Sequence, residues 1–330
     1  MTLILTAVTP TCIIQAGDRL LTRRVNGKLE EFDEKSNKSV IYEASDGVLS
    51  IGYCGLALIL GKLTDEWIAE QLNPAAKVSL DGSNLWSQTF TNASFSVALT
   101  CDGVIGLLRK KISELSASHF RDHGLEVVVS GWQIKNDKVI PILVRFARSS
   151  KDLNSASGFK KMAGSEINGR VEFAGSGNNP EVRSYMLKEL MTIHEDRQTP
   201  KTKEDLRKYA SDVRDALVAT IKFASTIEKT VGANVHTTTM HIPFEGHNYI
   251  QTDFYSDNPH PATIEMSTGI KKVKDAAVTG WVLFDSIILA PSYLVGGERI
   301  GGKSVVLDMY GAPPQEGLTG FIRAIPRKRS

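Results

Sequence analysis

The sequence is poor in cysteine and in net charge. Only three cysteines occur, Cys12, Cys54 and Cys101, and each stands alone within an apolar stretch. Isolated cysteines are typical of reduced thiols rather than of a disulfide framework, so we expect a cytoplasmic protein. The formal net charge of +2 gives no electrostatic reason to expect nucleic acid or a membrane surface as a partner.

Long hydrophobic runs are also missing. No stretch of eighteen consecutive apolar residues occurs, and the opening TLILTAV lacks the basic flank and length of a signal peptide. We therefore expect neither export nor a membrane span. With 330 residues, of which 42% are hydrophobic, the chain is long enough to bury a large core in one or two domains.

The first stretch of the chain predicts a hairpin. Apolar runs on either side of Thr9-Pro10-Thr11 read as two short strands, the second of which closes on Gly17-Asp18-Arg19. Thr2 then becomes the first residue of a sheet. A small residue after Met1 permits removal of Met1 by methionine aminopeptidase, which leaves a hydroxyl and a free α-amine on one residue. Because an α-amine has a pKa of roughly 7.7 to 8.0, it is suited to act as the base for that hydroxyl.

Further along, periodicity and turn signals alternate between strands and helices. We expect a hairpin of residues 39–44 and 48–52, a helix from Gly55 to Leu72, a helix over 104–115, strands over 125–130, 139–146 and 171–174, helices over 180–194 and 203–227, and strands over 237–242, 281–289 and 304–309. This order predicts an α+β fold with mainly antiparallel sheets.

Several short motifs follow one another in the order and at the spacing that one protein family shows. Counted from Thr2, they are Asp18, Thr22, Lys38, IGYCGLA at 51–57, LEVVVSGWQ at 125–133 and FAGSG at 173–177. In this order the chain resembles the N-terminal nucleophile (Ntn) hydrolases of the proteasome β-subunit and HslV type. The resemblance implies a four-layer αββα sandwich over residues 1–242, with residues 243–330 as a β-rich C-terminal extension packed on the same core. It also implies a homo-oligomer.

The same resemblance implies a site that cuts amide bonds, most simply those of peptides. Thr2 would be the nucleophile, Lys38 would lower the pKa of its amine, and Asp18 would hold Lys38. The Gly55 N–H would bind the oxyanion, and Ser176 would lie near the Thr2 amine. The expected substrate contacts are Thr22, which would pair with an extended peptide, and Tyr53 and Ala57, which would line the pocket for the side chain before the cut. No cofactor or metal is implied.

The chain departs from the family pattern after the second long helix. Where family members carry an Asp, a Ser and a pair of glycines, this chain reads Ile227-Glu228-Lys229-Thr230-Val231-Gly232. Thr230 can replace the Ser and Gly232 one of the glycines, but the Asp has no counterpart. An inactive relative that serves as an assembly or binding module is therefore the first alternative.

A second alternative comes from a literal phosphate-loop match at Gly297 to Ser304. A phosphate loop requires a helix N-terminus directly after it, whereas residues 305–310 are β-prone and Pro313-Pro314 prevents a long helix. We therefore expect a glycine-rich turn between strands. The histidines His236, His241 and His247 have no standard metal-ligand spacing and are expected to be strand and loop residues.

Overall fold

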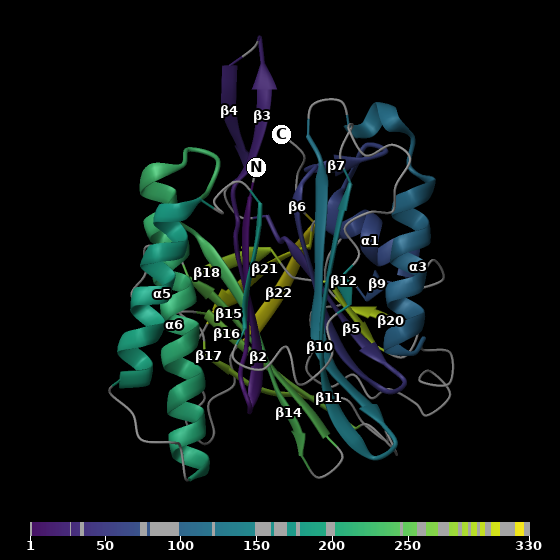
Figure 1. Ribbon diagram of the computed structural model, residues 1–330. Coiled ribbons are helices and arrows are strands. Elements are labelled where there is room, and N and C mark those ends of the chain that lie inside the picture. The colour runs from purple at the N-terminus through teal and green to yellow at the C-terminus, as the bar shows by residue number, and fades with distance from the viewer. Residues whose placement is uncertain are drawn as a thin grey trace.

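The structure is a computed structural model of residues 1–330, shown in Figure 1. It describes residues 2–26, 28–33, 36–72, 78–79, 99–120, 123–148, 160–161, 170–175, 179–195, 202–244 and 247–255, and beyond these the strands between 262 and 326. The helices are α1 (Thr64–Leu72), α3 (Cys101–Glu114), α5 (Pro180–Glu195) and α6 (Lys203–Ile227), with a short 3-10 helix at Ala117–Phe120.

One sheet of seven strands runs in the order β13-β1-β2-β14-β15-β16-β17. Its strands are β1 (Leu3–Val8), β2 (Cys12–Asp18), β13 (Val171–Gly175), β14 (Val235–Phe244), β15 (His247–Tyr255), β16 (Ala262–Gly269) and β17 (Ala277–Val282). Neighbouring strands in this sheet are antiparallel. We call it the N-terminal sheet, because it holds the expected first hairpin, which is confirmed.

The second sheet has eight strands in the order β12-β11-β10-β6-β5-β19-β20-β9. Its strands are β5 (Ser39–Ala44), β6 (Gly47–Gly55), β9 (Val78–Ser79), β10 (Leu125–Lys135), β11 (Lys138–Arg148), β12 (Lys160–Lys161), β19 (Ser292–Val295) and β20 (Glu298–Ile300). Smaller sheets are formed by β3 (Leu21–Val25) with β4 (Lys28–Asp33), by β7 (Leu58–Ile59) with β8 (Lys62–Leu63), and by β18 (Ser286–Leu289), β21 (Val305–Tyr310) and β22 (Phe321–Pro326). The α+β class is thus confirmed.

Three hydrophobic clusters define how these elements pack. Strand β1 alternates between two of them: Leu3 and Leu5 face α5 and α6, whereas Ile4 and Val8 face the other sheet. This period of two explains why all six residues of β1 are buried although they form one apolar run. The third cluster lies between the eight-stranded sheet and helices α1 and α3, which cover its other face (Figure 1).

A buried polar network joins the two sheets through Gln15 of β2. The Gln15 Nε2 donates to the Val128 carbonyl at 3.2 Å and to Ser130 Oγ at 3.3 Å, while Ser50 Oγ donates to Gln15 Oε1 at 2.9 Å. These partners belong to β10 and β6 of the opposite sheet. Buried polar groups specify a register when every member is satisfied, so this network fixes how the sheets face one another.

The long helices agree closely with the sequence. Helix α6 begins at a capping box, in which Thr202 Oγ1 accepts from the Asp205 N–H and Asp205 accepts from the Thr202 N–H. The prediction of a helix beginning at Gly55 is wrong. Leu60 and Gly61 have φ angles of 53° and 78°, which make the turn between β7 and β8, and α1 begins only at Thr64.

Candidate functional site

Three of the residues singled out in the sequence meet in one buried cluster. Thr2 lies directly before β1, Asp18 ends β2 and Lys38 lies directly before β5. The Lys38 Nζ donates to Thr2 Oγ1 at 2.5 Å and to Asp18 Oδ2 at 3.0 Å. The side chains are almost inaccessible, since the three residues are 4%, 1% and 2% exposed. The cluster therefore joins the two sheets at the end of the first hairpin.

Asp18 is fixed by backbone groups from three segments. Its Oδ1 accepts from the Leu3 N–H at 2.8 Å, and its Oδ2 accepts from the Leu20 N–H at 3.1 Å and the Gly232 N–H at 3.0 Å. A carboxylate held by several N–H groups has little freedom to rotate, so Asp18 sets the position of the Lys38 ammonium.

Lys38 uses all three of its N–H donors. Besides Thr2 and Asp18, its Nζ donates to the Leu20 carbonyl. Burial lowers the pKa of Lys38 from its ordinary value, and the neighbouring Asp18 carboxylate opposes that shift. An ammonium in this place puts positive charge directly on the Thr2 hydroxyl.

The end of β13 packs against Thr2. Leu3 pairs with Gly175, and a Cβ on Gly175 would lie 1.7 Å from the Thr2 carbonyl oxygen and 3.3 Å from Cys54 Sγ. Gly175 also has a φ of 98°, which side chains rarely adopt. Its N–H donates to Glu126 Oε2 at 3.2 Å, and Arg145 donates to the same carboxylate at 2.8 Å. Glu126 therefore anchors the backbone that contacts Thr2.

Strand β6 and the segment after it contain three of the predicted site residues, Tyr53, Gly55 and Ala57. Gly55 ends β6 with a φ of 100°, and a Cβ there would lie 1.9 Å from the Gly124 carbonyl oxygen. Tyr53 is buried beneath α1, its hydroxyl donates to the Asn37 carbonyl at 3.1 Å, and burial raises its pKa well above the ordinary value. Ala57 is half-buried, and its carbonyl accepts from the Thr64 N–H. The Gly55 backbone follows Cys54, which lies beside Gly175.

Two further residues are predicted to belong to the site, Thr22 and Ser176. Thr22 is on β3, half-buried, and lines a cavity of about 490 Å³ beside the cluster. Ser176 lies outside the described residues. The predicted site residues thus fall into a tight core, Thr2 with Asp18 and Lys38, and a set of neighbours whose roles stay predictions.

Sequence reasoning missed Leu20, Gly175 and Glu126. Leu20 acts through its backbone, so no side-chain motif marks it. Gly175 belongs to the quoted FAGSG stretch, where glycines signal close backbone approach, but only the fold shows that the approach is to Thr2. Glu126 lies on a strand in which a polar residue normally indicates a solvent-facing position.

The rival motifs find less support. Within the phosphate-loop match, Glu298–Ile300 is strand β20, and the residues after Ser304 form strand β21 rather than a helix. Residues 301–304 lie outside the description. Among the described residues, no group of three or more His, Cys, Asp or Glu side chains is placed to hold a metal ion, and no helix is long and apolar enough to cross a membrane. Cys12, Cys54 and Cys101 are buried free thiols.

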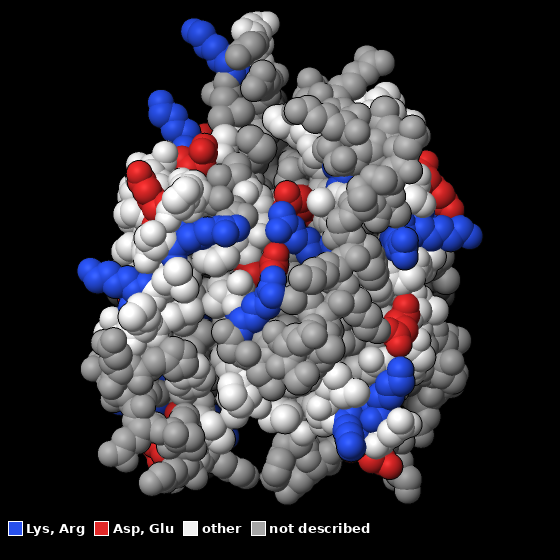
Figure 2. Space-filling model, in the orientation of Figure 1, with Lys and Arg blue, Asp and Glu red and all other residues white. Residues whose placement is uncertain are grey.

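Charge on the surface is mixed. On the face in Figure 2, the described Lys and Arg side chains lie among Asp and Glu side chains rather than in one basic patch. Arg145, for example, forms ion pairs with both Glu126 and Glu172. This mixture agrees with the small net charge of the sequence.

Comparison with known proteins finds neither a matching family model nor a matching curated protein. Solved structures do match. An Anbu (Gly-1) mutant from Hyphomicrobium sp. strain MC1 is 11% identical, with 73% of this chain and 82% of that chain covered and a TM-score of 0.40. Anbu (ancestral beta-subunit) from Yersinia bercovieri has the same identity and coverage at a TM-score of 0.38. The helical assembly of the Anbu complex from Pseudomonas aeruginosa is 10% identical, with 72% and 81% covered, at 0.35.

These findings correct the family suggested by the sequence motifs. The motifs pointed to the proteasome β-subunit and HslV type, whereas the matching structures are Anbu proteins and no family model matches the chain. The identification with that type is therefore wrong. At TM-scores of 0.40 and below, the likeness carries no argument about activity, so the function of this cluster has to be argued from its own geometry.

Proposed function

We propose that this protein is an N-terminal threonine hydrolase of the cytoplasm that cleaves amide bonds, with peptides as its substrates. The observation that supports the proposal is the Lys38 Nζ to Thr2 Oγ1 hydrogen bond of 2.5 Å within a buried cluster. A structural role alone does not require a buried lysine, which is costly to desolvate, to point at the second residue of the chain.

The proposed chemistry begins with removal of Met1, which frees the Thr2 α-amine. Thr2 Oγ1 then attacks the substrate carbonyl carbon while its proton passes to the α-amine, directly or through a water molecule. The protonated amine returns the proton to the leaving nitrogen, the C–N bond breaks, and an ester on Thr2 remains. Water attacks the ester and regenerates the hydroxyl. Each step needs only groups that Thr2 and water supply.

Lys38 and Asp18 prepare this reaction. The Lys38 ammonium favours the neutral α-amine by charge repulsion and stabilises negative charge that develops on Oγ1. Asp18, held by Leu3, Leu20 and Gly232, keeps the ammonium in place. In this proposal the Gly55 N–H receives the oxyanion, Ser176 lies near the amine, and Thr22, Tyr53 and Ala57 contact the substrate.

The proposal extends to architecture and assembly. We propose that the helix pair α5 and α6, the two large sheets and helices α1 and α3 form a four-layer αββα sandwich, with residues 243–330 as an extension packed on the same core.

We also propose a homo-oligomer. Sedimentation velocity of the purified protein at several concentrations tests this point, and a single species with the mass of one chain would contradict it.

The test of the activity is intact mass with and without a threonine-directed electrophile. We expect wild type to lack Met1 and to gain one adduct, which Thr2→Ser also forms and Thr2→Ala does not. Hydrolysis of a peptide library should follow the same order. Lys38→Met should lose roughly 10² to 10⁴-fold in rate, the range typical of general acid–base groups.

Circular dichroism of every variant checks folding. Met1 retained in all molecules of folded wild type, with neither adduct nor hydrolysis, would reject the enzyme. The inactive assembly or binding module would then be the better explanation, and the departure from the family pattern at residues 227–232 favours it.

A further inference from the structure

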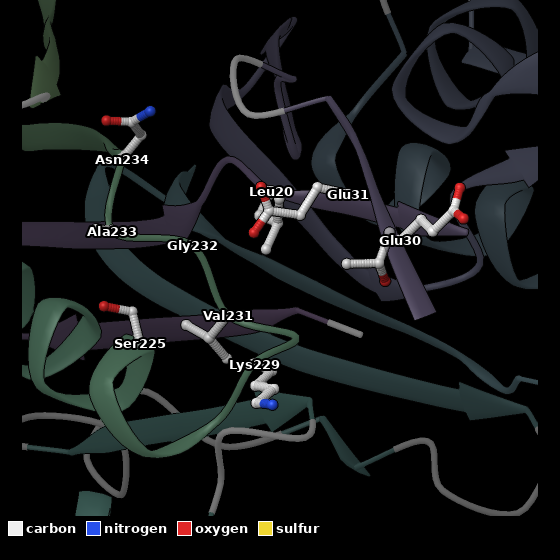
Figure 3. Close-up of a pocket in the computed structure, with 10 residues that line it drawn as sticks. Leu20, Glu30, Glu31, Ser225, Lys229, Val231, Gly232, Ala233 and Asn234 are labelled. Carbon is white, nitrogen blue, oxygen red and sulfur yellow. The ribbon is translucent and has the colours of Figure 1, made fainter. Parts of the chain in front are cut away.

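A cavity of about 490 Å³, whose lining residues are drawn in Figure 3, lies beside the Thr2 cluster. Two residues that line the cavity also bind the cluster through their backbone groups. Leu20 lines the cavity while its N–H and carbonyl bind Asp18 and Lys38, and Gly232 lines it while its N–H binds Asp18. A Cβ on Gly232 would lie 2.6 Å from Leu20 Cβ, so these two residues meet at the inner end of the cavity.

Two segments form the opposing walls of this cavity. One wall is the β3–β4 hairpin, which supplies Thr22, Glu30 and Glu31. The other is the chain from Ser225, in the last turn of α6, to Asn234, directly before β14. Among the described strands, β3 pairs only with β4. Its other edge has no strand partner there, so it can add an extended peptide.

The carboxylates on the hairpin differ in direction. Glu31 pairs with Thr22, whereas Glu30 pairs with Arg23, so the two glutamates leave β4 on opposite faces. In Figure 3 the Glu31 side chain extends toward Leu20, and the Glu30 side chain extends away from it. The basic residue of the lining, Lys229, lies at the end of α6 on the other wall and is exposed. Among the charged side chains that line the cavity, the one that extends toward its inner end is therefore the exposed carboxylate of Glu31.

We infer that this cavity is a specificity subsite that binds a lysine or arginine side chain of the substrate, next to the bond that Thr2 cuts, and that Glu31 selects it. The inference rests on the proposed hydrolase function and names its substrate class. The cavity has room for a long side chain. Leu20 at its inner end binds Lys38 through its carbonyl, so the cavity lies close to Thr2 and Lys38. A carboxylate there pairs with a cation. An acidic substrate residue in the same place would meet Glu31 with like charge.

The experiment compares wild type, Glu31→Gln, Glu30→Gln and Glu31→Lys on a positional peptide library. Glu114→Gln, which changes an exposed carboxylate on α3, is the matched control. We expect wild type to prefer Lys or Arg at one position flanking the cut. Glu31→Gln should reduce that preference roughly two- to five-fold, mainly through KM, because charge pairs open to solvent are weak. Glu30→Gln should keep the larger part of it, and Glu31→Lys should reverse it toward Asp and Glu.

Ionic strength gives an independent reading. The preference of wild type should shrink as salt is raised from about 0.1 M to 1 M, since the screening length falls from about 10 Å to 3 Å. Equal preference in wild type and Glu31→Gln, or a preference that salt does not change, would overturn the inference.

Labelling with a small uncharged electrophile that does not reach the cavity distinguishes an error in the proposed subsite from an error in the proposed hydrolase function. Thr2 labelling that is intact in all variants without any charge preference would reject only the subsite. Absent labelling in wild type would reject the hydrolase function and, with it, the subsite.

Discussion

At the scale of single residues, Gly175 carries the strictest steric requirement near Thr2. Its φ of 98° and the 1.7 Å separation that a Cβ would have from the Thr2 carbonyl oxygen leave no room for any side chain. We predict that Gly175→Ala destabilises the fold by at least about 1–2 kcal/mol, the cost of a left-handed conformation alone, and displaces Thr2. Urea unfolding and labelling of Thr2 by the electrophile measure the two effects.

Gly106→Ala is the control for that substitution. Gly106 lies inside α3, and a Cβ there would meet nothing within 4 Å. Alanine should stabilise α3 by roughly 0.5–1 kcal/mol and leave labelling unchanged. A Gly175→Ala variant as stable and as readily labelled as Gly106→Ala would contradict the close contact with Thr2.

His236 predicts a dependence of stability on pH. Burial and the nearby Arg19 charge lower its pKa to about 3, and its ring stacks on Phe254 at 4.9 Å. The folded protein keeps His236 neutral while the unfolded chain protonates it below its ordinary pKa of about 6.5. Its contribution to stability is therefore full above pH 6.5 and is lost as the pH falls toward 3, at about 1.4 kcal/mol per pH unit.

The measurement is urea unfolding at about pH 7 and pH 4.5 for wild type, His236→Gln and His119→Gln. His119 is a partly exposed histidine that serves as the control. His236→Gln should lose less stability on acidification than wild type does. The same loss in wild type and His236→Gln would show that His236 is not the group that titrates.

At the scale of elements, α6 is tied to the N-terminal sheet by a buried ion pair. Arg214 Nη1 donates to Asp253 Oδ2 at 3.1 Å, and Gln251 and Thr237 donate to the same carboxylate group. Asp253 is fully buried. We predict that Asp253→Asn lowers the free energy of unfolding by about 3–5 kcal/mol, because it removes the buried partner of the Arg214 charge and leaves only the exposed Asp215 at 3.6 Å.

Thermal and urea unfolding of Asp253→Asn and Glu114→Gln test this. Glu114 pairs with Lys111 on the surface of α3, where the two side chains are 47% and 34% exposed. Such pairs contribute about 0–1 kcal/mol, so Glu114→Gln should unfold nearly as wild type does. Similar small losses in both variants would mean that the Arg214–Asp253 pair does not anchor α6.

The elements that could be predicted from sequence are those with strong local signals. The capping box at Thr202, Pro180 in a first turn and the turn at Thr9-Pro10-Thr11 each fix a boundary within a few residues. The failure at Gly55 has a local cause as well. The apolar spacing from Leu56 to Leu72 resembles a helix, but Leu60 and Gly61 take left-handed conformations that periodicity does not reveal.

Of the candidate site, Thr2, Asp18 and Lys38 are singled out by their spacing along the chain, and the structure brings their side chains together while their roles stay predictions. Leu20 and Gly232 hold these residues through backbone N–H and carbonyl groups, and Glu126 holds the backbone N–H of Gly175 beside Thr2 with its carboxylate. Any residue type has such backbone groups, so only the fold can place them.

At the scale of the whole molecule, the strands after residue 242 continue the sheet that holds Thr2. Strand β15 pairs with β14 over eight positions, and Asp253 on β15 binds Arg214 of α6. We predict that a chain ending at Phe244 does not unfold cooperatively, since it lacks both contacts, whereas a chain ending at Gly269 keeps them and does.

Urea titration followed by fluorescence and circular dichroism distinguishes the two truncated chains. Coincident, cooperative transitions for the shorter chain would establish residues 1–244 as a domain able to fold alone. If only the chain ending at Gly269 shows such transitions, β15 is part of the minimal folding unit.

The Lys38 contact also makes the site sensitive to how the two large sheets lie against each other. Thr2 and Asp18 belong to one sheet and Lys38 to the other, and the polar network around Gln15 is among the contacts that keep them in register. A sliding of the sheets by one ångström would leave every strand intact and still lengthen the 2.5 Å contact beyond a hydrogen bond. On heating, the proposed hydrolysis should therefore be lost at a lower temperature than the secondary structure, and Gln15→Ala should widen the interval between the two temperatures.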